Sequence, residues 1–384
     1  MKKGFKVIEI RKAGFLNKGA QLMLFAIIEY FNKNLPDAKL VMAPTRSASY
    51  INRAKLGFYQ KAHYWRKGVQ FGFLANLIPS KLRDMYGIIL DKEVDVVIDA
   101  SGFSYSDQWG KYSCLEMLSS CVRWKKNNTK IILMPQAFGP FNSTFNKIAI
   151  KKIIGYSNLT FARDEISYNY LQEITGSLKS LKISNDFTNL LSGIVPEKFD
   201  HEFNKFCFIP NFRMIDKTNK SNKEWYLPVM IMMLKYCHLN NQKPFILVHD
   251  LESDLSIAKE MRNAVDQSIN IILEQDPLKI KGIIGVSTGV IGSRYHGIIS
   301  ALSQGVPTLS IGWSHKYEML FNEYDFKEGM LDINMSKEEI ISKINMILDE
   351  DSKIKIKEKL KIKGDELKIQ SQKMWEEVFK VIRT

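Results

Sequence analysis

The sequence has few cysteines and lacks any long apolar run. Its four cysteines show neither the short spacing with histidines that is typical of zinc sites nor the pattern of a disulfide framework. No stretch approaches the roughly 18 apolar residues of a membrane-spanning helix, and residues 1–14 lack the apolar core of a signal peptide. We therefore expect a cytoplasmic protein without disulfides, a metal or a cofactor.

Acidic residues are absent between Asp37 and Asp84, although basic and aromatic residues are frequent there. Such a segment suits an anionic membrane surface, a diphosphate-bearing lipid or single-stranded nucleic acid, and an ordinary excursion with core aromatics is the structural alternative. The net charge of +14 also invites a nucleic-acid interpretation, but many lysines alternate with glutamates in the last fifty residues, as on a solvated helix face. We expect peripheral membrane contact through residues 39–83 and no nucleic-acid partner. The basic residues of this segment are Lys39, Arg46, Arg53, Lys55, Lys61, Arg66, Lys67, Lys81 and Arg83.

The chain is long enough for two domains, and its apolar pattern repeats strand, turn and helix. With 384 residues, 45% of them hydrophobic, it can bury a substantial core. Alternating strands and helices are typical of parallel sheets covered by helices. Around residues 193–204 the periodicity lapses into Pro, Glu, Lys and Asp, which indicates an interdomain connection. We therefore predict domains at 1–195 and 205–335, followed by helices at 336–384 that pack on them.

The clearest unit runs from Gly289 to Lys316 and contains a cluster of basic residues. A strand ends at Gly292, a helix follows, and Gly305 with Pro307 should end that helix before a strand at 308–311. Because ligands of parallel sheets bind beyond the carboxyl ends of the strands, the turn between strand and helix is a predicted anion site. Its side chains suit a phosphate or carboxylate. The predicted ligand-binding residues are Arg294, Tyr295, His296 and Gly297, joined after the second strand by Ser314, His315 and Lys316.

Polar residues also follow the predicted strands of the first domain. A turn at 17–21 opens the first helix and offers backbone N–H groups. Asp107 follows the strand at 94–98, where it either deprotonates a hydroxyl or caps a helix. The remaining predicted site residues of this domain are Asn17, Gln136, Arg163 and Asp186.

These motifs resemble the polysaccharide pyruvyl transferase family. The resemblance rests mainly on GSRYHGIISALSQGVPTLSIGWSHK, and it extends to Asn17-Lys18-Gly19, to residues 136–140 and to residues 161–167. It implies two Rossmann-like doubly wound α/β domains facing a cleft, similar to the GT-B architecture. Two departures, Ala20-Gln21 and Ala100-Ser101-Gly102, fall on the acceptor side, where the family often has an acidic residue and a double glycine.

The resemblance implies transfer of the enolpyruvyl group of phosphoenolpyruvate to two hydroxyls of a sugar, giving a pyruvate ketal in a surface polysaccharide or its lipid-linked precursor. Phosphoenolpyruvate carries a phosphate and a carboxylate, so it needs two cationic anchors, and Arg163 and Arg294 fit them. His296 is the expected acid that protonates carbon three, and Asp107 is the expected base. Tyr295, Gly297, His315 and Lys316 are assigned to the donor. Asn17 and Gln136 are assigned to the acceptor.

Two other functions remain open from the sequence. A GT-B glycosyltransferase that uses a nucleotide sugar would share the fold and the basic site, and Glu318 is the nearby acidic residue that could hold a ribose. A non-catalytic protein that binds anionic membranes or nucleic acid through residues 39–83 is the second alternative.

Overall fold

The computed structural model describes residues 5–66, 69–216, 218–251, 253–312 and 315–384. The chain forms two compact units, of which the first contains residues 1–187 and 370–384 and the second contains residues 188–369. The chain therefore forms most of the first unit, then the whole second unit, and its last 15 residues return to the first unit. The predicted boundary near residues 193–204 falls within the second unit, which begins at residue 188, and residues 193–195 pack on a helix of that unit near Gly282.

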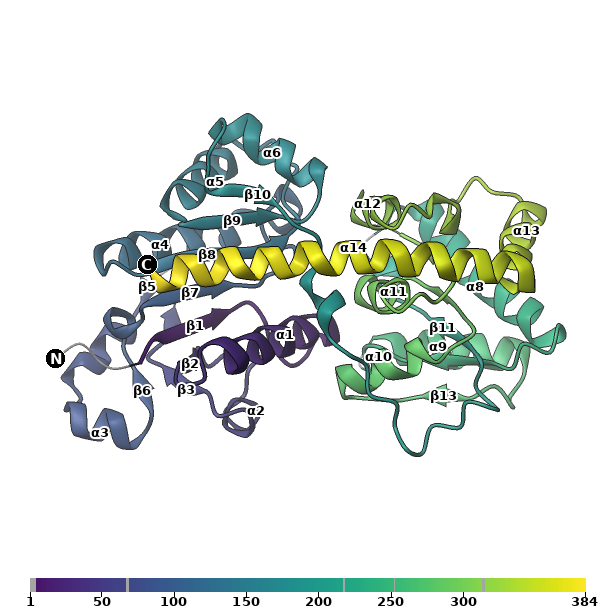
Figure 1. Ribbon diagram of the computed structural model, residues 1–384, viewed down its shortest axis with the longest axis horizontal. Helices are drawn as coiled ribbons and strands as arrows, with labels where there is room; N and C mark the ends of the chain where they lie inside the picture. The colour runs from purple at the N-terminus through teal and green to yellow at the C-terminus, as the bar shows by residue number, and fades with distance from the viewer. Residues whose placement is uncertain (1–4, 67–68, 217, 252, 313–314) are drawn as a thin grey trace. The chain divides into compact units, whose positions relative to one another are not determined.

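The first unit is built on a parallel sheet. Among the described residues this sheet has eight strands in the order β10-β9-β8-β7-β1-β2-β3-β6 (Figure 1). A separate antiparallel pair is formed by β4 (Trp65–Arg66) and β5 (Val69–Gln70). The sheet strands are β1 (Val7–Arg11), β2 (Lys39–Met42), β3 (Tyr59–Lys61), β6 (Ile88–Ile89), β7 (Val96–Asp99), β8 (Lys130–Gln136), β9 (Leu159–Ala162) and β10 (Leu181–Ile183).

Helices cover both faces of this sheet. Alternate strand residues such as Val97 and Leu133 share a buried core with residues of α4, α5 and α6. The other face carries α1 and the end of α14 (Figure 1). Tyr30 of α1 stacks there on Trp375 of α14, with ring centroids 4.6 Å apart. The helices are α1 (Lys18–Asn34), α2 (Tyr50–Lys55), α3 (Ser80–Met85), α4 (Tyr112–Lys126), α5 (Thr144–Tyr156) and α6 (Glu165–Thr175), with short 3₁₀ helices η1 (Gly72–Leu77), η2 (Asp91–Glu93) and η3 (Asp107–Trp109).

The second unit repeats the same architecture with a smaller sheet. In the described part of the chain its six strands are all parallel and follow the order β13-β12-β11-β14-β15-β16. Strand residues such as Phe208 and Ile291 are fully buried, as expected for a sheet covered on both faces. The strands are β11 (Phe206–Ile209), β12 (Pro244–Leu247), β13 (Ile271–Ile272), β14 (Gly289–Gly292), β15 (Thr308–Ile311) and β16 (Met330–Leu331).

The helices of the second unit alternate with its strands. Gly305 has φ +74° after α11, so this glycine ends the helix in the left-handed conformation that the sequence predicts. The long helix α14 starts in the second unit, and its residues from 370 onward belong to the first. The helices are α7 (Arg213–Asp216), α8 (Lys220–Leu239), α9 (Asp254–Val265), α10 (Pro277–Gly285), α11 (Tyr295–Leu302), α12 (His315–Glu323), α13 (Lys337–Leu348) and α14 (Glu350–Arg383), with η4 (Phe187–Leu190) and η5 (Lys327–Gly329).

Each sheet has one point where the strand order reverses direction. In the first unit the chain proceeds outward from β1 to β2 and β3, then returns to place β7 on the other side of β1. In the second unit β11 is followed outward by β12 and β13, and β14 returns to the other side of β11. In open parallel sheets, ligands bind beyond the carboxyl ends of the strands at such a reversal. The fold therefore singles out the loops after β1 and β7, and those after β11 and β14.

Candidate active site

The loop after β14 is fixed to the loop after β11 at the reversal point of the second sheet. The side-chain amide of Asn211 donates to the carbonyl oxygen of Ser293 at 2.7 Å, and the hydroxyl of Tyr317 donates to the same oxygen, also at 2.7 Å. Asn211 and Tyr317 are both buried. Two buried hydrogen bonds therefore hold the backbone immediately before Arg294.

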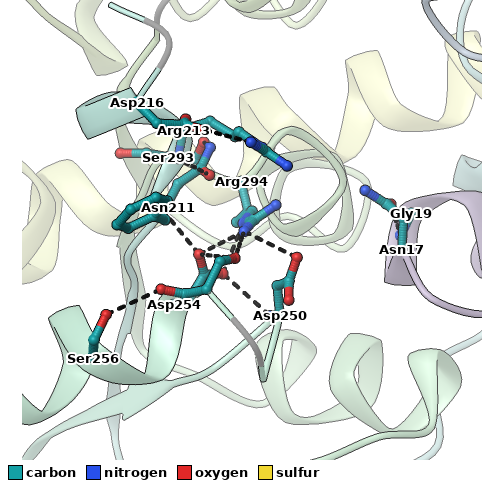
Figure 2. A network of polar contacts seen from close by, with 12 residues as sticks. Asn17, Gly19, Asn211, Arg213, Asp216, Asp250, Asp254, Ser256, Ser293 and Arg294 are labelled. Carbon is teal, nitrogen blue, oxygen red and sulfur yellow. Dashed lines mark hydrogen bonds and ion pairs between the residues drawn. The ribbon is translucent and has the colours of Figure 1, made fainter.

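Arg294 forms a two-point ion pair with Asp254, which lies 40 residues earlier in the chain. Its Nε donates to Asp254 Oδ2 at 2.8 Å and its Nη2 donates to Asp254 Oδ1 at 2.5 Å. Asp250 lies 3.6 Å from the same Nη2, and the hydroxyl of Ser253 accepts from it at 3.2 Å. Figure 2 shows the guanidinium between the two aspartates, with dashed lines to each. This two-point geometry fixes the plane of the guanidinium as well as its position.

The carboxylate partner keeps this buried arginine charged. The side chain of Arg294 is 10% exposed and that of Asp254 is 0% exposed. Burial disfavours the guanidinium charge, but Asp254 more than offsets this effect, and the pKa of Arg294 lies above its ordinary value. Asp254 also accepts from the backbone N–H of Phe212 at 2.9 Å. Arg294 is thus an oriented cation whose charge is already balanced within the protein.

The ring of Tyr295 contacts three neighbouring side chains after β14 and β15. Tyr295 packs edge to face against His296 and Tyr317, at centroid distances of 5.6 and 5.5 Å. The ammonium of Lys316 lies 5.0 Å from the centroid of the Tyr295 ring. The structure therefore brings Tyr295, His296 and Lys316 together beyond β14 and β15, as the sequence predicts. His315 is the first residue of α12, and Ser314 lies outside the described residues.

Gly297 is a packing position in the first turn of α11. A Cβ atom placed on it would lie 3.1 Å from the Cδ1 atom of Ile209, at the end of β11. The absence of a side chain thus lets α11 approach the neighbouring strand closely. Its assignment to the donor stays a prediction.

Arg163 follows β9 in the first unit and is held in a similar way. Its Nη1 lies 3.3 Å from Asp186 Oδ2, and both side chains are at most 4% exposed. The next residue, Asp164, caps α6 by accepting from the N–H of Ser167 at 2.7 Å. The pairing of Arg163 with Asp186 places two of the predicted first-unit residues together. That Arg163 and Arg294 bind one donor stays a prediction.

Asp107 organises the segment that leads into α5. Its Oδ2 accepts from the backbone N–H groups of Asn142 and Ser143, and its Oδ1 accepts from the amide of Asn146 at 2.7 Å. Slight burial alone would raise the pKa of Asp107, but these donors outweigh it and the pKa lies below its ordinary value. Asp107 therefore holds the two residues that precede α5, and this bonding, which lowers its pKa, makes it a weaker base. Its catalytic role stays a prediction.

Asn17 and Gln136 are both engaged in local structure. Asn17 accepts from the N–H groups of Gly19 and Ala20 at 2.9 and 3.1 Å, so its side chain caps α1 and occupies donors that the sequence offered to an anion. Gln136 is 0% exposed, accepts from Ser101 and donates to Asp99 at 3.4 Å. Acceptor binding by these residues stays a prediction. Because Gln136 is fully buried, it would influence the acceptor through its partners Ser101 and Asp99.

The basic segment 39–83 divides into structural and exposed residues. Arg53 and Lys61 are buried, with Arg53 bonded to the Ala48 carbonyl oxygen and Lys61 paired with Glu9 and Asp91. Lys67 lies outside the described residues. The exposed basic residues in the described part are Arg46, Lys55 and Lys81.

The described residues contain neither a cluster of metal-binding side chains nor a helix suited to crossing a membrane. In the ranges given above, no group of three or more His, Cys, Asp or Glu side chains is arranged to hold a metal ion. No helix in this same part of the chain has both the length and the apolar character needed to cross a membrane.

The sequence did not reveal the partners of Arg294. Asp250 follows β12 at a strand end, where a ligand-facing carboxylate is expected, but Asp254 lies within the first turn of α9 and reads as an ordinary helix residue. Only the parallel pairing of β11 with both β12 and β14 brings the ends of these strands together.

Several solved structures share the fold. UDP-GlcNAc 2-epimerase from Neisseria meningitidis, bound to UDP-GlcNAc, aligns with a TM-score of 0.61 and 10% identity, covering 98% of this chain and 100% of that chain. HepE from Anabaena, in complex with UDP and glucose, has a TM-score of 0.59 and 11% identity over 98% and 100% of the two chains. A glycosyltransferase from Rickettsia africae has a TM-score of 0.60 and 13% identity over 100% of both chains. At these identities the likeness shows a two-domain Rossmann-like fold of the GT-B type.

The sequence itself identifies the family. No curated protein matches the chain. The sequence profile of the polysaccharide pyruvyl transferase family matches residues 17–315, which is more than half of the 384 residues and includes Arg163, Arg294 and His296. The chain therefore belongs to the polysaccharide pyruvyl transferase family.

Proposed function

We propose that this protein transfers the enolpyruvyl group of phosphoenolpyruvate to a sugar of a surface polysaccharide or its lipid-linked precursor. Membership of the family carries the proposal, because it points to a transferase that modifies polysaccharides. The product is a pyruvate ketal that joins two hydroxyls of one sugar. The reaction proposed here uses no cofactor.

In this reaction His296 protonates carbon three of phosphoenolpyruvate, so that carbon two becomes electrophilic. A sugar hydroxyl attacks carbon two, and the bond from that carbon to the phosphate oxygen breaks. The second hydroxyl then attacks the same carbon to close the ketal. Of the two protons lost by the hydroxyls, one replaces the proton given by His296 and the other leaves on the phosphate. Arg294 and Arg163 are the proposed anion anchors, with Lys316 and His315 beside the phosphate.

The test is phosphate release from phosphoenolpyruvate in the presence of glycan from the source organism, with mass spectrometry of the product. Wild-type protein should release phosphate only with glycan, and the glycan should gain a pyruvate group. His296→Asn should lower kcat by about 10²-fold or more, as is typical when a general acid is removed. His201→Asn is the matched control, because this histidine of the same unit is 67% exposed. Absence of any glycan-dependent phosphate release would reject the proposal.

Transfer from a nucleotide sugar is the competing function. The solved relatives in complex with UDP or UDP-GlcNAc favour it, and Glu318 is exposed in the first turn of α12. Thermal shift assays separate the two donors. We expect phosphoenolpyruvate to raise the melting temperature, and stabilisation by UDP-sugars alone would instead support the glycosyltransferase.

We also propose that the basic segment 39–83 contacts an anionic membrane surface, where a lipid-linked acceptor would be found, and that the apolar part of this contact lies in the segment 72–86. This segment comprises η1 and α3, and most of its apolar side chains are exposed. Lys81 is exposed within it, and Arg46 and Lys55 are exposed nearby in sequence. The exposed apolar residues are Phe73 at 60%, Leu74 at 52%, Leu77 at 83%, Leu82 at 44%, Met85 at 75% and Tyr86 at 72%.

Cosedimentation with vesicles tests this contact. The protein should bind vesicles rich in phosphatidylglycerol more tightly than vesicles of phosphatidylcholine. The double variant Leu77→Ser, Met85→Ser should weaken binding about tenfold or more, because each buried apolar side chain contributes roughly 1.5–3 kcal/mol. Leu239→Ser with Leu273→Ser is the control, since these leucines are 69% and 52% exposed in the second unit. Equal binding by both double variants would reject the contact.

A further inference from the structure

A pocket of about 390 Å³ opens at the reversal point of the first sheet. It lies beyond the carboxyl ends of β1 and β2, and α4 contributes one wall through Glu116. Its volume falls at the low end of the roughly 300–1,000 Å³ that is typical of small-molecule sites. The position and size suit a ligand of about one sugar ring.

Two aromatic side chains of the pocket have polar atoms without a hydrogen-bond partner among the described residues. His63 and Trp65 both line it and are half-buried. Throughout the described part of the chain, no group hydrogen-bonds the imidazole nitrogens of His63 or the indole N–H of Trp65. The hydroxyls of Thr45 and Ser47, 3.2 Å apart, also line the pocket. A ligand here meets an apolar ring face together with hydroxyl, imidazole and indole hydrogen-bonding groups.

The charges that line this pocket balance. Arg11 and Lys12 supply two positive charges, and Glu9 and Glu116 supply two negative ones. Arg11 Nη2 lies 2.6 and 2.7 Å from the two oxygens of Glu116, and Lys12 lies 3.5 Å from the same carboxylate. Burial, followed by the neighbouring Arg11, lowers the pKa of His63, which therefore stays neutral at pH 7. A charged ligand would gain no net opposite charge in this environment, whereas an uncharged polyol can use the hydrogen-bonding groups.

The backbone at the rim is held in an uncommon conformation. Lys12 directly follows β1 and has φ +61°, in the left-handed region that residues other than glycine rarely adopt. The pairing of Arg11 and Lys12 with Glu116 holds the loop in place. Strained residues of this kind cluster at ligand sites, where they fix a wall of the pocket in advance.

We propose that this pocket binds one uncharged sugar ring of the acceptor glycan, stacked on Trp65 and hydrogen-bonded through its hydroxyls to His63, Thr45 and Ser47. The proposal rests on the proposed function for the view that the glycan is an acceptor. It assigns the sugar to residues other than Asn17 and Gln136, which do not line the pocket.

Saturation-transfer NMR with methyl glycosides of glucose, galactose and N-acetylglucosamine tests the proposal, with methyl galacturonoside as the charged comparison. At least one neutral glycoside should bind the full-length protein. Trp65→Ala and His63→Phe should each weaken that binding about tenfold or more. Trp109→Ala is the matched control, because Trp109 is 44% exposed and lies outside the pocket. The melting temperature and the shift given by phosphoenolpyruvate should be unchanged in all three variants, which shows that each is folded.

The outcomes separate this inference from the proposed function. Binding of phosphoenolpyruvate without binding of any neutral glycoside, or glycoside binding that survives both pocket substitutions, overturns the sugar pocket and leaves pyruvyl transfer standing. Preference for the galacturonoside also overturns it, since the charge balance then has no bearing on the ligand. Glycoside binding that depends on Trp65, without any response to phosphoenolpyruvate, supports the pocket and rejects the donor.

Discussion

Replacing Asp254 by asparagine should lower the melting temperature of the second unit strongly. The change keeps the shape of the side chain and removes its charge. Arg294 would then remain buried, with Asp250 at 3.6 Å in place of the two short contacts to Asp254. The new amide would also present N–H groups where the guanidinium needs acceptors.

The expected size follows from burial. Breaking a buried ion pair by removing one partner costs about 3–5 kcal/mol, because an uncompensated charge is left behind. This range applies here since the Asp254 side chain is 0% exposed and that of Arg294 is 10% exposed. For a unit of this size, each kcal/mol lowers the melting temperature by roughly 2–4 °C. Asp254→Asn should therefore lower the melting temperature by about 6–20 °C.

Calorimetry of wild type and variant measures this shift, and Asp216→Asn is the matched control. Asp216 pairs with Arg213 in the same unit, but these side chains are 26% and 46% exposed, so the loss should stay below about 1 kcal/mol (Figure 2). The double variant Asp254→Leu, Arg294→Met should recover much of the stability, because it removes both buried charges. A shift for Asp254→Asn no larger than that of the control would refute the reasoning.

Three further predictions concern stability and thiol reactivity. Gly282→Ala places a Cβ 2.2 Å from the backbone of Ile194 and should destabilise the fold by about 1–3 kcal/mol in urea unfolding, whereas Gly155→Ala, in open space within α5, should not. Burial raises the pKa of Glu116, but Arg11 outweighs it and the pKa falls from 4.5 to about 2. The resulting stabilisation of roughly 3 kcal/mol is present above pH 4.5 and lost as the pH falls toward 2, so Glu116→Gln should be less stable than wild type at pH 7 and equal to it near pH 2. Native protein should react with a thiol reagent only after unfolding, since burial raises the pKa of all four buried thiols, to about 11 for Cys114, about 12 for Cys121 and Cys237, and well above the ordinary value for Cys207. Rapid labelling of the folded protein would contradict this last expectation.

The sequence predicts the long and strongly periodic elements well. The strand, helix and strand predicted within residues 289–311 are β14, α11 and β15. In these segments the apolar period, the glycine after α11 and the following proline all favour one structure. The two-residue strands β6 and β16 carry no such period and were not predicted.

The local roles of the site residues depend on contacts between distant parts of the chain. Asp107 was expected to deprotonate a hydroxyl or to cap the helix after it. Its carboxylate accepts from the backbone N–H groups of Asn142 and Ser143, just before α5, and its catalytic role stays a prediction. The division of α14 between the two units also depends on contacts between distant parts of the chain. Its apolar residues occur along the whole helix, so periodicity could not show that residues from 370 onward pack with the first unit.

Both arginines assigned to the donor are paired with buried carboxylates, and this bears on how the donor would be attracted. Asp254 balances Arg294 and Asp186 balances Arg163, so each pair brings an oriented set of N–H donors but little net positive charge. A dianion gains its long-range attraction from net charge and its alignment from fixed donors. In the proposed reaction, Lys316, whose ammonium lies against the Tyr295 ring, and the N-terminus of α11 would then attract the donor, while the arginines would select its orientation. A lysine in place of either arginine would keep the charge and lose the alignment, because one ammonium cannot reproduce a planar two-point contact.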